Sequence, residues 1–109
     1  ARRVFHLTSA GRDAFQNWLY SPVQRPRQMR QEFQAKLYFA QLLGSDTCER
    51  LITQQRQICR QWLELQQKSV EQDSADSIFL ELVDQYRAGQ IQAMLDWLQY
   101  CKQKLSGSA

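Results

Sequence analysis

Side chains that commonly catalyse reactions or bind metals are few in this 109-residue chain, and they lie far apart. There is one histidine, His6, and the three cysteines, Cys48, Cys59 and Cys101, are separated by 11 and 42 residues. A zinc site needs several such ligands at close spacing, and a nucleophilic triad needs a base beside the nucleophile. The acidic residues are mostly single or stand at helix starts, where the helix dipole favours negative charge. The sequence therefore predicts no enzyme activity, no bound metal and no cofactor.

The cysteines instead favour a reducing compartment. An odd number at wide spacing fits no disulfide framework, so we expect three small buried thiols in a cytoplasmic protein. No apolar run approaches the roughly 18 residues that a membrane-spanning helix requires, and the N-terminus has no secretory signal. The chain begins with Ala1 and not with methionine, which we interpret as a sign of a longer parent protein.

Arginine and aromatic side chains are the remaining candidates for binding. Residues 1–30 carry six arginines and one aspartate, a net charge of +5, whereas residues 31–109 carry eight basic and ten acidic residues, a net charge of −2. Anions are therefore expected near the N-terminus, and Arg2 and Arg3 are candidates for contacts with nucleic-acid phosphates. Aromatic residues at helical spacing usually belong to a core, but they can also line a pocket for a flat aromatic ligand. The candidates for such an effector pocket are Trp18, Phe39 and Trp62.

The composition predicts a single, mostly helical domain. The chain has 18 glutamines but only 4 glycines and 2 prolines, which excludes a turn-rich β-sandwich and a Pro/Gly linker. A mass of 12.9 kDa corresponds to a folded surface of roughly 6,300 Å², so about two-thirds of the open chain's surface can be buried. We expect an all-α fold, an antiparallel bundle of about four helices with two long ones, preceded by a short strand.

The N-terminal segments predict a strand and then a helix. Residues 2–7 alternate and are β-branched or aromatic in the middle, which indicates a strand whose partner lies elsewhere. Thr8 is a suitable N-cap for a helix over residues 9–20, where apolar residues recur at helical spacing. Both prolines fall in residues 21–27, which we expect to form an irregular connection.

A second helix is expected over residues 28–43, and its apolar stripe is so wide that it should be the most buried helix. Gly44 is placed to end it. Asp46 and Glu49 have the spacing of a capping box that opens a third helix over about residues 46–69.

The fourth helix is expected over about residues 75–104, after a polar turn within residues 66–77. Gly89 interrupts its pattern and should mark a kink or a close helix crossing. In the third helix, Gln55 occupies one place of an otherwise apolar stripe.

The lengths of the last two helices favour a homodimer. They would span roughly 36 Å and 45 Å, against a diameter of roughly 34 Å for a compact domain of this size. Their apolar stripes continue to the helix ends, and a second copy related by a two-fold axis would cover the overhang most simply. The predicted dimer contacts are Leu82, Val83, Tyr86, Met94, Trp97 and Leu98.

Residues 2–19, RRVFHLTSAGRDAFQNWL, resemble the junction in PadR-family transcriptional regulators, where the second wing strand of a winged helix leads into the C-terminal domain. Two shorter blocks, at residues 32–43 and 94–99, are similar to later helices of that domain. In the first block the resemblance rests on Arg3, Phe5, Leu7, Thr8, Gly11, Arg12, Trp18 and Leu19.

The resemblance implies a repressor that binds operator DNA as a dimer through an N-terminal winged helix, which this chain lacks. Residues 1–8 would be the remnant of the wing, residues 9–105 the helical dimerisation and effector domain, and residues 106–109 a disordered tail. In some family members a pocket responds to small phenolic or drug-like ligands, so a small aromatic effector is expected. The alternative that we weigh is a helical adaptor without a DNA role, which binds another protein's amphipathic helix.

Overall fold

The computed structural model describes residues 8–72 and 77–105, all of them in or between helices. The elements are α1 (Ser9–Tyr20), the short 3-10 helix η1 (Pro26–Met29), α2 (Glu32–Leu43), α3 (Ser45–Gln72) and α4 (Ile78–Leu105). The all-α prediction is confirmed, and this part of the chain contains no strand. The predicted strand over residues 2–7 and the tail at 106–109 lie outside the described residues.

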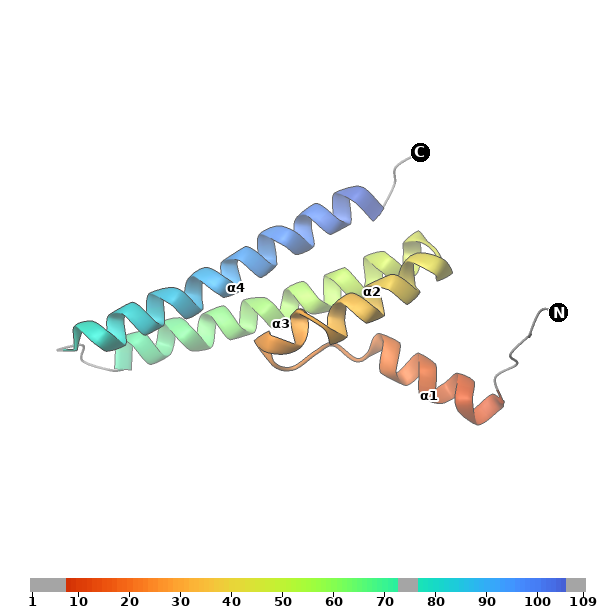
Figure 1. Cartoon of the computed structure of the whole chain (residues 1–109), viewed down its shortest axis with the longest axis horizontal. Coiled ribbons are helices and arrows are strands. Elements are labelled where there is room, and N and C mark those ends of the chain that lie inside the picture. Colours follow the sequence, from red (N-terminus) through yellow and green to blue (C-terminus); the bar gives the residue numbers. More distant parts are fainter. Residues whose placement is uncertain (1–7, 73–76, 106–109) are drawn as a thin grey trace.

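The two long helices form an antiparallel hairpin that dominates the molecule (Figure 1). The helix α2 packs on α3, while α1 makes fewer contacts, with α2 and α3. The molecule measures 65 × 34 × 23 Å, and its radius of gyration is 17.7 Å, against about 13 Å for a compact domain of this length. The arrangement is therefore an elongated hairpin with two shorter helices at one end, which confirms the prediction of four helices with two long ones packed together.

The predicted cap of the first helix is confirmed. The backbone N–H of Gly11 donates to the Thr8 hydroxyl at 3.0 Å, which satisfies one of the first-turn donors. At the other end the Ser21 N–H donates to the carbonyl of Trp18. The helix therefore has the predicted bounds.

Gly44 ends α2, as predicted, and it stands directly before the first residue of α3. Its φ of 131° is one that residues with a Cβ rarely adopt, and its N–H donates to the Ala40 carbonyl at 3.0 Å. The Gly44 carbonyl then accepts from the Cys48 N–H at 3.2 Å. The predicted capping box at Asp46 and Glu49 is wrong, because both residues lie inside α3, which already begins at Ser45.

Two further expectations about the helices need correction. The predicted helix over residues 28–43 is divided into η1 and α2 by a turn at residues 30–31. Pro26 stands at the start of η1, where a missing N–H costs least. The helix α4 continues through Gly89, and a Cβ built there would meet no atom within 4 Å, so this glycine marks no close crossing.

The core consists of two clusters. The larger one joins the middle of the hairpin to η1 and α2, and its buried members are Val23, Met29, Phe33, Ile52, Cys59, Ile91, Leu98 and Cys101. The smaller one lies where α1, α2 and α3 meet, and its buried members are Leu19, Ala40, Cys48 and Leu51. The expectation of buried thiols is confirmed, since all three cysteines are free and buried.

The second helix is buried on one of its faces only. One face, with Phe33 and Ala40, is buried, while the other carries four exposed apolar side chains. These residues, which we call the α2 patch, are Tyr38, Phe39, Leu42 and Leu43.

Candidate functional site

A polar clamp fixes the connection between α1 and η1. The side-chain amide of Gln55 on α3 is fully buried and accepts a hydrogen bond from the Val23 N–H at 2.9 Å. Its Nε2 donates to the Val23 carbonyl at 3.0 Å, so both backbone groups of Val23 are satisfied by one side chain. The clamp therefore joins the connection to a residue 32 positions further along the chain.

Lys36 on α2 holds the same connection from another side. Its Nζ donates to the Ser21 carbonyl and lies 5.2 Å from the centre of the Trp18 ring. Burial lowers the pKa of Lys36, and the nearby carboxylate of Glu32 partly opposes this shift. Gln55 and Lys36 together fix the direction of α1 relative to the rest of the domain.

The predicted effector residues do not come together as one group. Trp18 and Phe39 are neighbours, with ring centroids 6.0 Å apart and planes at 77°, and Phe15 packs on both. Trp62 packs instead against the larger core cluster. Arg2 and Arg3, the predicted contacts to DNA phosphates, lie outside the described residues.

The predicted dimer residues fall into three environments. Leu82 and Tyr86 are exposed by 59% and 67%, and Val83 between them is half-buried. Met94 and Trp97 are half-buried in the middle of α4. Leu98 is fully buried in the core cluster, so this chain already covers its side chain.

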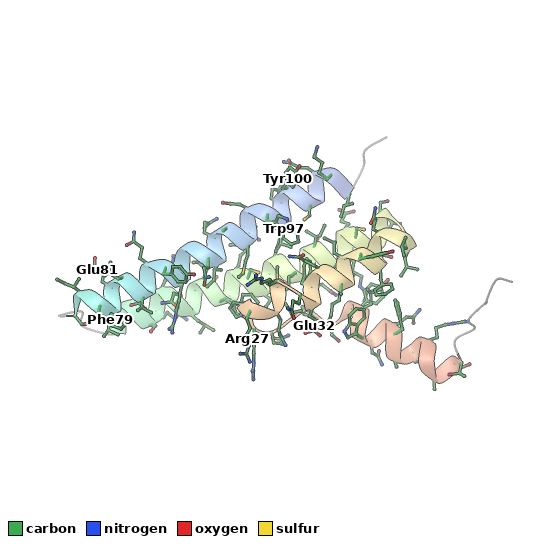
Figure 2. All side chains as sticks on the ribbon, viewed as in Figure 1. Arg27, Glu32, Phe79, Glu81, Trp97 and Tyr100 are labelled. Carbon is green, nitrogen blue, oxygen red and sulfur yellow. The ribbon has the colours of Figure 1, made fainter. Side chains whose placement is uncertain are left out.

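The free end of the hairpin carries an apolar surface that we call the tip patch. It comprises residues near the end of α3 and the start of α4 whose side chains are between 44% and 75% exposed. Figure 2 shows Phe79 and Glu81 at this end, far from the labelled residues of η1 and α2. Ile78, Phe79, Leu82 and Tyr86 share one face of α4 by helical spacing, and exposed apolar side chains on one face are typical of an interaction surface. The tip patch contains Leu65, Ile78, Phe79, Leu80, Leu82 and Tyr86.

A groove of about 1,030 Å³ lies between the η1 segment and α4. Its apolar lining includes Met29, Ile91, Met94 and Trp97, and the Trp97 ring meets Phe33 edge-on at 6.0 Å. We call it the arginine groove, because four arginines also line it: Arg25, Arg27, Arg30 and Arg87. Figure 2 shows Arg27 on η1 and Trp97 on α4, both near the middle of the molecule's long axis. The sequence does not indicate this site, because Arg87 is far along the chain from the other three arginines.

A smaller pocket of about 510 Å³ lies on the other side of the connection, where Trp18, Glu32 and Lys36 contribute to its lining. Because Lys36 is already bonded to the Ser21 carbonyl and packed against Trp18, we interpret this pocket as the outer side of the clamp.

The buried thiols are poor nucleophiles. Burial raises the pKa of Cys59 to about 11, although a hydrogen bond with Gln55 partly opposes the shift. Burial also raises the pKa of Cys48 and Cys101. In residues 8–72 and 77–105 no three histidine, cysteine or acidic side chains are grouped to hold a metal ion. None of the described helices combines the length and apolar content needed to cross a membrane.

Comparison with known protein families identifies the class. Residues 29–106 match the family described as the virulence activator alpha C-terminal domain, and this range includes all of α2, α3 and α4. The chain therefore belongs to this family, the helical C-terminal domain found in PadR-family regulators. The family is a regulator domain and not an enzyme. Searches of curated proteins and of solved structures gave no match.

Proposed function

We propose that this chain is the homodimerisation domain of a PadR-like transcriptional repressor, in which it fixes the spacing of two winged helices on operator DNA. The observation that carries the proposal is the tip patch, an exposed apolar surface on a hairpin whose middle is already filled by its own core. The family to which the chain belongs supports the regulatory role.

The surface area of the chain favours a partner. It exposes 8437 Å², against roughly 6,300 Å² for a compact protein of its mass. A standard interface buries roughly 800 Å² on each side, about a tenth of the exposed surface here. The large exposed side chains of the tip patch would supply the apolar centre of such an interface.

A second copy is the simplest partner, because a two-fold axis lets the same surface of each hairpin cover the other. Leu82 and Tyr86 stand one turn apart on α4 and are both well exposed, so they are the proposed centre of the contact. We place Met94 and Trp97 outside this centre, since they line the arginine groove.

The coupling to DNA would pass through α1. By the PadR resemblance, α1 follows the wing directly, and the wing arginines Arg2 and Arg3 would contact the DNA backbone. Because Gln55 and Lys36 fix the connection after α1, a shift of α2 or α3 would change the direction of α1 and the spacing of the winged helices. An effector would act by such a shift, and the free thiols fit a protein of the cytoplasm.

A pair of substitutions on α4 tests the dimer. Leu82→Asp places a carboxylate in the tip patch, and Gln99→Asp places the same group at an exposed polar position about 25 Å further along α4. By sedimentation equilibrium we expect Leu82→Asp to weaken self-association at least about tenfold, with Gln99→Asp close to the unsubstituted chain. Circular dichroism checks that both variants remain helical.

Equal self-association of the two variants would overturn the tip patch as the interface. Leu98→Asp is not a useful variant, because a charge at this fully buried position would unfold the core. A chain that does not self-associate at all would favour the adaptor, with the tip patch as the surface for a different protein.

A further inference from the structure

We propose that the arginine groove binds an elongated organic anion, a straight apolar chain that ends in a carboxylate or a phosphate. Such an anion would be the effector of the regulator, and this regulatory role of the groove rests on the proposed function. Binding itself depends only on the groove within one chain.

The groove is long and apolar along its floor. Its α4 wall runs from Arg87 to Trp97, a stretch of about 15 Å at 1.5 Å per residue. Within this stretch Ile91 and Met94 recur at helical spacing, so they share one face with both ends. The volume of about 1,030 Å³ is at the upper end of that of small-molecule sites.

The groove is also strongly positive. Arg25, Arg27 and Arg30 come from the η1 segment and Arg87 from α4, so positive charge lies on two separate elements. In the part of the chain that the structure describes, none of these four side chains forms an ion pair, and no acidic residue lines the groove.

The nearest acidic residues in the sequence do not line the groove. Glu32 lines the smaller pocket beside Lys36, and the Asp84 carboxylate lies next to the groove, where it accepts a hydrogen bond from the groove residue Gln66 at 2.8 Å. A bound anion would therefore supply the missing counter-charge, for which the guanidinium groups offer paired hydrogen bonds.

The shape and lining favour a chain-like ligand over other anions. Met94 and Trp97 are the half-buried apolar side chains of the groove, and Met94 adapts to a flexible aliphatic chain. Met29 and Ile91 are members of the buried core cluster on which the groove rests. A free inorganic anion would leave this apolar floor uncovered, and a single aromatic ring would fill only part of its length. The arginines exclude chains with a cationic head.

Isothermal titration of the chain tests the proposal with decanoate and decyl phosphate, both below their micelle concentrations. Decyltrimethylammonium carries the same chain with the opposite charge, and inorganic phosphate carries the head group alone. We expect saturable binding of one decyl anion per chain, with the tighter of the two identifying the preferred head group. The tryptophan fluorescence of the chain, to which Trp97 in the groove contributes, should change with the same midpoint.

Two matched pairs of variants locate the site. We expect the double variant Arg27→Gln/Arg30→Gln to weaken binding about tenfold or more. Arg12→Gln/Arg60→Gln, which removes two exposed arginines outside the groove, should bind as the unsubstituted chain does. Ala93→Trp should fill the groove and abolish binding, whereas Gln92→Trp, at the neighbouring exposed position, should not.

Three results would overturn the groove as an anion site: no saturable binding of either decyl anion, equal binding of decyltrimethylammonium, or unchanged affinity in Arg27→Gln/Arg30→Gln. Inorganic phosphate that binds as tightly as decyl phosphate would overturn the role of the apolar floor. Light scattering on the same samples keeps the two proposals apart, because a monomer that binds decanoate contradicts only the dimer, and a dimer that binds neither anion contradicts only the groove.

Discussion

Gln55 and Val23 satisfy each other completely: the Gln55 amide accepts from the Val23 N–H at 2.9 Å and donates to the Val23 carbonyl at 3.0 Å. Gln55 is fully buried and Val23 is 3% exposed, so water has little access to either bond. An irregular connection thus gains the kind of paired hydrogen bonds that a sheet would provide. These two hydrogen bonds fix the position of the connection that follows α1.

Replacement of Gln55 by leucine should therefore be costly. Gln55→Leu keeps a similar volume but leaves the N–H and the carbonyl of Val23 without partners, and we expect a loss of about 2–3 kcal/mol in the free energy of unfolding. Urea denaturation measures the loss. Gln57→Leu, at an exposed position of the same helix, is the control and should change stability by less than about 0.5 kcal/mol. Equal effects of the two variants would contradict the clamp.

Lys36→Met should loosen α1 selectively. The substitution keeps the apolar stem but removes the bond to the Ser21 carbonyl and the charge beside Trp18. We expect amide hydrogen exchange in the connection after Ser21 to become about tenfold faster, while exchange in the middle of α3 and α4 stays unchanged. Lys68→Met, on the exposed surface of α3, should leave exchange unaltered throughout. Uniformly faster exchange would instead indicate a general loss of stability.

Two glycines should respond in opposite directions to alanine. Gly44 has a φ of 131°, so Gly44→Ala strains the backbone although open space surrounds the position, and we expect a loss of about 1–2 kcal/mol. Gly89 lies inside α4, where a methyl group would have open space around it, so Gly89→Ala should gain about 0.5–1 kcal/mol. Thermal and urea denaturation measure both. Stabilisation by Gly44→Ala would contradict the backbone geometry of the joint between α2 and α3.

Stability should fall in alkaline solution, in part because of Cys59. Its pKa is raised from 9.0 to about 11 by burial, so between these pH values the folded chain holds a proton that the unfolded chain has released. The Cys59 contribution to the free energy of unfolding is therefore full below pH 9 and decreases as the pH rises towards 11. Cys59→Ala should give a flatter stability profile over this range, whatever its effect at neutral pH. Urea denaturation at several pH values measures the free energy of unfolding. If it falls with pH as steeply in Cys59→Ala as in the unsubstituted chain, this assignment is contradicted.

The helices could be predicted from the sequence wherever periodicity and caps agreed. The bounds of α1 were predicted correctly because Thr8 and the apolar spacing indicate the same start, and Gly44 was recognised as a helix end. The division at residues 30–31 was missed because the apolar stripe continues from Met29 to Phe33 through a turn. The elongated shape follows from helix lengths, whereas the position of α1 depends on hydrogen bonds that no local pattern encodes.

The candidate sites show the same limit. The exposure of Leu82 and Tyr86 at the tip fits their predicted role in a dimer contact, but Leu98, on the same apolar stripe of α4, faces the core. A helix stripe does not distinguish contacts within the chain from contacts between chains. The arginine groove requires that the η1 segment be placed beside α4, a tertiary contact that could not be read from spacing.

The mass of the chain in solution, measured by light scattering across a dilution series, tests the central claim most directly. A homodimerisation domain should show twice 12.9 kDa from high concentration down to the micromolar range. A mass of 12.9 kDa at tens of micromolar would contradict the account, since the tip patch would then not hold two copies together.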